Sequence, residues 1–331
     1  MTRWILILSG LFCLVLVVGI IALCTGAAGI DINTIPAILM TGGSSAEYSI
    51  LMEIRLPRIL LGMAIGGALS LAGTLLQGMF RNPLVEPYTL GISGGASLGV
   101  CINILFKCYA VIGIIAYPLF GFAGASLVIF LVYSLNRSNT HVKSNRMLLT
   151  GVMISYVASS LVMLLMALSH TDDLQNIVLW IMGSLDEPNT QLIQVACIGS
   201  VIGLLISYFF CMDLNALTLG DEEATSLGVN TARTKKILFI VASFLTGLSV
   251  SVAGIIMFVG LIVPHFVRML TGPDHRILLA ASFLAGAAFL TASDVIARVI
   301  IAPLELPVGV ITGIIGGIMF IWALSRRQVS L

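Results

Sequence analysis

Charged residues are scarce in this sequence. Asp, Glu, Lys and Arg make up 9% of it and hydrophobic residues 59%, whereas soluble proteins average about 25% charged residues. The mean hydropathy is +1.11. Most of the surface must therefore face something other than water, which excludes an ordinary soluble protein. The formal net charge of +1 says little about partners, and we expect no nucleic-acid partner.

The sequence also lacks the signatures of metal and nucleotide chemistry. Its six cysteines form no CxxC pair, and its four histidines form no spaced pair. We interpret the cysteines as small buried hydrophobic residues, and we expect no metal site, no cofactor and no catalytic residue. The phosphate-binding pattern GxxxxGK[ST] is absent as well. If the protein is a pump, its ATPase must be another chain.

What the sequence does contain is a series of long apolar stretches between isolated charges. A helix needs about 20 apolar residues to cross a bilayer, and most stretches fit one crossing. The stretch between Lys236 and Arg268 is 31 residues long and contains Gly254 and Gly260, so we divide it into two spans. The pattern predicts an all-α polytopic membrane protein, a single transmembrane domain over residues 1–331. Its ten helices are expected near 4–28, 57–79, 89–106, 110–135, 147–168, 192–212, 236–253, 258–270, 277–299 and 308–325.

The basic residues predict the orientation in the membrane. With the N-terminus inside, 12 of the 16 basic residues fall on the inner side. The remaining four, on the outer side, are Arg55, Arg58, Lys107 and Arg298. Because basic residues concentrate in cytoplasmic loops, we expect cytoplasmic N- and C-termini in the cell (inner or plasma) membrane.

An outer segment, residues 170–188, has apolar residues at helical spacing behind Thr171 and Asp172. This pattern predicts a short helix that lies on the membrane surface. The apolar residues are Leu174, Ile177, Val178, Ile181 and Met182.

A faint internal repeat joins two parts of the chain. "SLAG" (70–73) ends ten residues before Pro83, and "SVAG" (251–254) ends ten residues before Pro264. Five predicted spans separate the copies, so the two halves would have inverted topology, as in many transporters. Chance similarity remains an alternative for so short a motif.

Ionisable residues are nearly absent from the predicted spans. The exception is Asp294 with Arg298, four residues apart on one helix face, where the two side chains can pair. Carriers coupled to protons or sodium usually need a carboxylate or histidine at depth. A secondary transporter without an ATPase is therefore the weaker alternative.

One charged segment, "TLGDEEATSLGVNTARTKK" (218–236), interrupts the apolar pattern. Gly220 and Gly228 bracket its acidic part. Acidic side chains suit the first turn of a helix, and glycine commonly ends one. The segment predicts a cytoplasmic helix of about two turns, suited to docking a soluble partner. A solvated loop would explain the basic residues that follow but not an acidic, capped helix.

Two further patterns leave alternatives open. Arg55, Arg58 and Arg298 are either snorkelling anchors or a positive ring for an external partner with carboxylates.

"GISG" (91–94) carries the serine pattern of rhomboid-like intramembrane proteases, with His265 as a base. The longer "GISGGASLG" equally fits small residues that allow close helix packing, and the protease is a remote alternative.

Taken together, the sequence resembles the iron-siderophore, haem and cobalamin import permeases, the ten-helix membrane subunits of type II ABC importers. The resemblance runs essentially end to end. It rests on "RLPR" (55–58), "LAGTLLQGMFRNPLVEPYTLGISGGASLG" (71–99), "LGDEEATSLGVN" (219–230), "GLIVPHFVRMLTGPDHR" (260–276), "SDVIAR" (293–298) and "ELPVGVITGIIGGIMFIWAL" (305–324).

The resemblance implies an assembly and a mechanism. Such permeases are homodimers with two P-loop ATPases below and a binding protein that delivers the ligand from outside. Alternating access is driven by the ATPases, and the permease performs no covalent chemistry. The ligand would be an iron chelate (a ferric siderophore or haem) or cobalamin, with an oxyanion also open.

The resemblance also assigns roles to residues. The outer arginines Arg55, Arg58 and Arg298 would meet binding-protein carboxylates. Ser144 and Asn145, in "HVKSNR" (141–146), would lie at the inner gate. The ATPase-coupling surface would comprise Leu219, Gly220, Asp221, Glu222, Glu223, Ala224 and Gly228. There the wider pattern Glu-Ala-Ala-x-x-x-Gly is followed loosely, because Glu223 replaces the first alanine.

Overall fold

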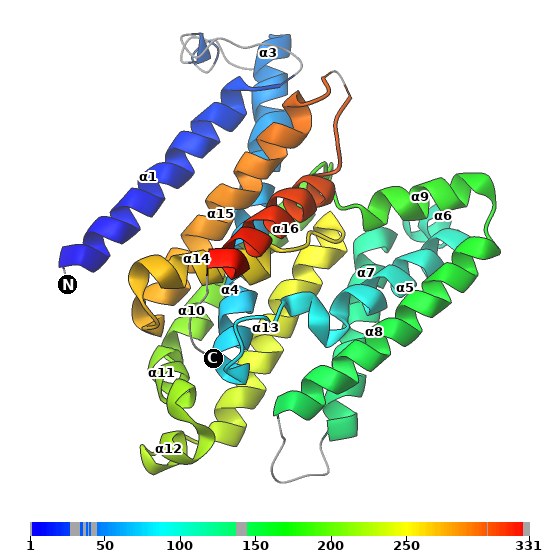
Figure 1. The fold of residues 1–331 in the computed structure, drawn as a ribbon. Helices are drawn as coiled ribbons and strands as arrows, with labels where there is room; N and C mark the ends of the chain where they lie inside the picture. The colour runs from blue at the N-terminus through cyan, green and yellow to red at the C-terminus, as the bar shows by residue number, and fades with distance from the viewer. Residues whose placement is uncertain are drawn as a thin grey trace.

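The computed structural model describes residues 2–26, 34–35, 38, 40, 45–136, 144–302 and 304–326. Within these ranges the chain forms helices and no strands. The long helices form a bundle, with α3 (Ala46–Ser49) at one end and α12 (Asp221–Ser226) at the other (Figure 1).

Each of the ten predicted spans corresponds to a helix. Seven helical stretches in the described ranges are long and apolar enough to cross a membrane, and three apolar helices, α5, α14 and α16, are shorter. The ten are α1 (Thr2–Cys24), α4 (Leu56–Phe80), α5 (Ile92–Leu105), α7 (Ala116–Asn136), α8 (Ser144–Ala167), α10 (Thr190–Phe209), α13 (Thr231–Ala253), α14 (Val259–Thr271), α15 (His275–Val299) and α16 (Val308–Arg326).

Short helices connect or extend the long ones. The π-helix η1 (Ile50–Arg55) joins α3 to α4, so this stretch is helical over 35 residues. The others are the 3-10 helix η2 (Pro87–Leu90), α6 (Tyr109–Ile112), α9 (Thr171–Ile181), α11 (Cys211–Leu219) and α12.

Helix α4 is the buried centre of the bundle and packs at backbone distance against its neighbours. A Cβ atom at Gly66 would overlap the backbone of Gly286 in α15. One at Gly73 would overlap the carbonyl group of Gly260 in α14. Small residues let two helix backbones approach this closely. Such close packing holds membrane helices together, because in lipid no hydrophobic force acts between them.

Three predicted spans differ from the helices observed. The expected helix 110–135 is divided into α6 and α7 by Gly113, whose φ is 83°. The expected helix 89–106 begins only at Ile92, after Gly91 with a φ of 85°. The expected helix 192–212 ends at Phe209, and α11 follows as a separate helix held by polar contacts to α13 and α15.

The short helix predicted in the outer segment is present as α9, which lies over the ends of α5 and α7 (Figure 1). Its N-terminal cap residue is His170, and Asp172 and Asp173 lie in its first turn. Ile177 is fully buried in a cluster with residues of α5 and α8, such as Val100 and Val162. The amphipathic spacing therefore marks an inward face that packs on protein.

The two copies of the internal repeat do not share a local structure. Gly73 lies inside α4, whereas Gly254 ends α13 with a φ of 69°. Pro83 follows α4, whereas Pro264 lies inside α14.

The "GISGGASLG" stretch serves helix packing. A Cβ at Gly95 would lie 2.5 Å from the carbonyl oxygen of Gly124 in α7, and one at Gly94 would contact Ser155 and Ala158 of α8. The packing interpretation of these small residues is confirmed.

Candidate functional site

The predicted short helix of the charged segment is present as α12. Asp221, Glu222 and Glu223 occupy its first turn, where acidic side chains face the positive end of the helix dipole. At its end the Gly228 amide donates to the Thr225 carbonyl (2.9 Å) and the Val229 amide to the Ala224 carbonyl (3.0 Å). This pair of bonds is a Schellman motif with glycine at its left-handed position, at a φ of 87°.

Helix α12 is fastened to the bundle on one side. Ala224 is fully buried, and the Asp221 carboxylate forms an ion pair of 2.6 Å with the Lys235 ammonium of α13. The preceding helix α11 is fastened too, because the Thr234 hydroxyl donates to the Asp213 carboxylate over 2.8 Å. Displacement of α12 would therefore act directly on α13.

A second connection reaches α15. The Asn215 side-chain amide donates to the Asp274 carboxylate (2.9 Å), and the His275 backbone amide donates to the Asn215 side-chain oxygen (2.8 Å). Asp274 also caps α15 and binds the Arg276 guanidinium at 2.6 Å. The hydrogen bond from that guanidinium is the main reason why the pKa of the Asp274 carboxyl lies well below its usual range. Sequence reasoning missed this junction, because Asn215 and Asp274 are 59 residues apart.

The other side of α12 is open. An open hollow of about 500 Å³ is lined by Leu219, Glu222, Glu223, Ser226 and Leu227. The two leucines are 63% and 66% exposed. Exposed apolar side chains beside carboxylates suit a soluble partner that offers apolar and basic groups.

At the opposite end of the bundle, buried charges join α4 to α15. The predicted Asp294–Arg298 pair is confirmed, with Arg298 Nε 3.0 Å from the Asp294 carboxylate. Arg58 contacts the same carboxylate at 2.9 Å and the Glu305 carboxylate at 2.6 Å. Arg58 and Asp294 are 236 residues apart, so no local spacing could have indicated this cluster.

The three outer arginines are buried in this structure. Arg55 donates to the Leu23 carbonyl at the end of α1, and Arg298 donates to the Thr25 carbonyl over 2.8 Å. Charges removed from water require partners, which the carboxylates and the carbonyls at and just after the end of α1 supply. Their role in docking stays a prediction.

The segment between α4 and α5 organises the start of α14. The Glu86 carboxylate accepts from the Phe258 backbone amide over 2.7 Å, and the Tyr88 hydroxyl accepts from the Ile256 amide over 3.1 Å. These bonds satisfy backbone groups of a non-helical stretch inside a membrane bundle, where an unsatisfied group costs several kcal/mol. The predicted gate residues Ser144 and Asn145 begin α8, and their side chains lie outside the described part of the chain.

Curated proteins from several organisms are similar over most of the chain. The hemin transport system permease HmuU of Yersinia pestis is 38% identical, covering 87% of this chain and 86% of its own. The cobalamin import permease BtuC of Halobacterium salinarum is 39% identical (88% and 77% covered). The Fe(3+) dicitrate transport permease FecD of Escherichia coli is 41% identical (85% and 87% covered).

A solved structure has the same fold. It is described as an inward-facing conformation of a metal-chelate type ABC transporter, and it matches with a TM-score of 0.86 at 31% identity, covering 97% of this chain and 99% of its own. Residues 14–326 match the FecCD transport family. The resemblance found in the sequence is thereby confirmed: this chain belongs to the FecCD transport family and is a multi-pass, all-α membrane protein with the fold of an ABC transporter permease.

Proposed function

We propose that this chain is the membrane-spanning subunit of an ABC importer, and that it works as a homodimer with two P-loop ATPases and an extracytoplasmic binding protein. The observation that carries the proposal is α12. One side of this short helix is tied to α13 through Asp221 and Lys235. Its other side offers exposed Leu227 beside acidic residues.

The side of the membrane follows from the charges. Twelve of the 16 basic residues lie on the side of α12 when the spans alternate, so this side and both termini are cytoplasmic. The ATPases then dock where α11 and α12 project from the bundle (Figure 1).

The contacts of α12 supply the coupling. When ATP draws the two ATPases together, their movement displaces α12. The Asp221–Lys235 ion pair transmits this displacement to α13. The Asn215–Asp274 hydrogen bond transmits it from α11 to α15. Helices held together by ion pairs and hydrogen bonds can shift as rigid bodies between two packed arrangements. In this proposal the two arrangements open the pathway to the inside and to the outside of the membrane. ATP hydrolysis belongs to the partner, and the permease itself performs no covalent chemistry.

The cargo we propose is an iron chelate such as a ferric siderophore or haem, with cobalamin as the alternative. Similar proteins are named for hemin, cobalamin and Fe(3+) dicitrate. In the described residues no group of three or more histidine, cysteine or acidic side chains could hold a bare metal ion. A chelate that keeps its own metal ligands fits such a path.

Docking of the binding protein is proposed at Arg55, Arg58 and Arg298. Because Arg58 and Arg298 already pair with carboxylates of the chain, an incoming carboxylate must compete with these. Glu305 is the replaceable partner, since its side chain is 46% exposed whereas that of Asp294 is 2% exposed.

The experiment is co-purification of the tagged chain from its native host in mild detergent. We expect a stoichiometric P-loop ATPase, and uptake by reconstituted vesicles that requires ATP. Leu227→Asp should abolish ATPase recovery, because it places a charge on the docking face. Val111→Asp is the matched control on α6, where the side chain is 88% exposed, and should retain the ATPase.

The contrary result is equally clear. A chain that purifies alone, and moves substrate in vesicles without ATP, would establish a secondary transporter instead. Retention of the ATPase by Leu227→Asp would remove α12 as the docking element.

A further inference from the structure

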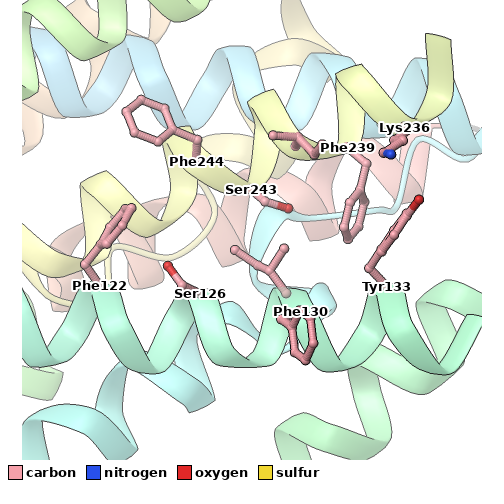
Figure 2. Close-up of a pocket in the computed structure, with 10 residues that line it drawn as sticks. Phe122, Ser126, Phe130, Tyr133, Lys236, Phe239, Ser243 and Phe244 are labelled. Carbon is pink, nitrogen blue, oxygen red and sulfur yellow. The ribbon is translucent and has the colours of Figure 1, made fainter. Parts of the chain in front are cut away.

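A groove between α7 and α13 is separate from the proposed coupling and docking sites. Its volume is about 290 Å³. Figure 2 shows aromatic side chains from the two helices along it, among them Phe122 and Phe130 of α7 and Phe244 of α13. Ser126 and Ser243 lie near its middle, where their small side chains leave room between the helices.

The groove lies on an apolar surface of the bundle. Phe130 is 66% exposed, and Phe122, Ile240 and Phe244 are also exposed. Its lining contains no acidic side chain. An exposed apolar surface of this kind suits contact with lipid acyl chains.

One end of the groove carries a positive charge. The Lys236 ammonium lies 5.3 Å from the centre of the Tyr133 ring, and Figure 2 places both side chains at the same end. Its neighbour Lys235 forms an ion pair with Asp221. Within the described part of the chain, Lys236 has no ion pair with a carboxylate, so its charge is available to an outside anion.

The length of the groove fits one leaflet. Phe122 and Tyr133 are eleven residues apart along α7, about 16 Å at 1.5 Å per residue. Half of a 30 Å hydrocarbon core is about 15 Å. An acyl chain lying from Tyr133 to Phe122 would therefore reach the middle of the bilayer while its headgroup stayed beside Lys236.

We propose that this groove binds one anionic phospholipid, with its phosphate on Lys236 and an acyl chain between the aromatic side chains of α7 and α13. Basic residues at the ends of grooves between membrane helices recognise anionic headgroups. In the orientation proposed above, the lipid belongs to the cytoplasmic leaflet. The binding itself requires neither the ATPase nor transport, so its failure would leave the proposed function intact.

Native mass spectrometry of the full-length chain in mild detergent tests the proposal. Phosphatidylglycerol and phosphatidylcholine with the same acyl chains are titrated separately. We expect tighter binding of phosphatidylglycerol. Lys236→Gln should weaken that binding roughly fivefold, the contribution expected of one lysine at a membrane surface, and should leave phosphatidylcholine unaffected.

Two further variants separate charge from shape. Arg276→Gln removes another exposed cation, which already pairs with Asp274, and should leave lipid binding unchanged. Ser126→Phe fills the partly exposed middle of the groove and should reduce binding of both lipids, with an unchanged elution profile showing that the chain is folded. An unchanged preference for phosphatidylglycerol in Lys236→Gln, or undiminished lipid binding in Ser126→Phe, would overturn the proposal.

Discussion

Replacing Gly73 by alanine tests how closely the central helix α4 packs on α14. A Cβ at this position would lie 2.6 Å from the carbonyl carbon and 2.8 Å from the Cα of Gly260, with the carbonyl oxygen nearer still. Real Cβ atoms essentially never approach another heavy atom within 3.0 Å. Both partners are backbone, so no side chain can rotate away. The two helices must therefore separate, and the carbonyl oxygen of Gly260, the nearest atom, sets how far.

Two opposing effects set the magnitude. Alanine favours a helix over glycine by about 1 kcal/mol, whereas overpacking a filled interior costs about 1–3 kcal/mol or more. Separation also stretches the hydrogen bond from the Gln77 side-chain amide to the Leu261 carbonyl, which is 3.1 Å long. Because the overlap is with backbone, we expect a net loss of about 2 kcal/mol.

The assay is the apparent melting temperature in detergent, followed by the loss of the monodisperse elution peak. A loss of about 2 kcal/mol corresponds to a fall of roughly 3 °C for a protein of this size. Gly10→Ala is the matched control, because a Cβ there meets nothing within 4 Å. If Gly73→Ala melts at the same temperature as Gly10→Ala and the unmodified protein, the close approach of α4 and α14 is refuted.

Two predictions concern charged groups at opposite ends of the bundle. Asp294→Ala leaves buried Arg58 and Arg298 without the carboxylate they share, and breaking such a pair should cost about 3–5 kcal/mol; an unchanged melting temperature would contradict the buried network. Asp274→Asn keeps a side chain that can cap α15 but removes the charge bound to Arg276. Because the folded state lowers the pKa of Asp274, its charge stabilises the protein above the unfolded pKa of about 3.9 and ceases to do so as the pH falls through the lower folded value. The melting-temperature difference between the variant and the unmodified protein should therefore be small, because the site is exposed. The difference should be the same at pH 7 and pH 5 and should diminish only below pH 4. A difference already lost at pH 5 would contradict the lowered pKa.

Local signals in the sequence were sufficient for the helices and for α12. A backbone inside lipid must satisfy its own hydrogen bonds, so a long apolar run without charges leaves helix as the available structure. The acidic first turn and Gly228 likewise act within a few residues of one another, which is why α12 and its end were correctly predicted. The breaks at Gly113 and Phe210 were missed, since a glycine is tolerated inside a membrane helix and nothing near Phe210 signals a turn.

The sequence alone thus determined that this chain is a helical membrane protein and which segment projects from it on the side of the basic residues. Only the tertiary structure decided what the outer arginines contact. From the sequence, Arg58 could face water, lipid headgroups or a partner. In the fold, Asp294, 236 residues away, reaches it because α4 and α15 approach closely at Gly66 and Gly286. Glu305, 247 residues away in the segment after α15, binds the same guanidinium, because a buried charge requires an opposite charge beside it.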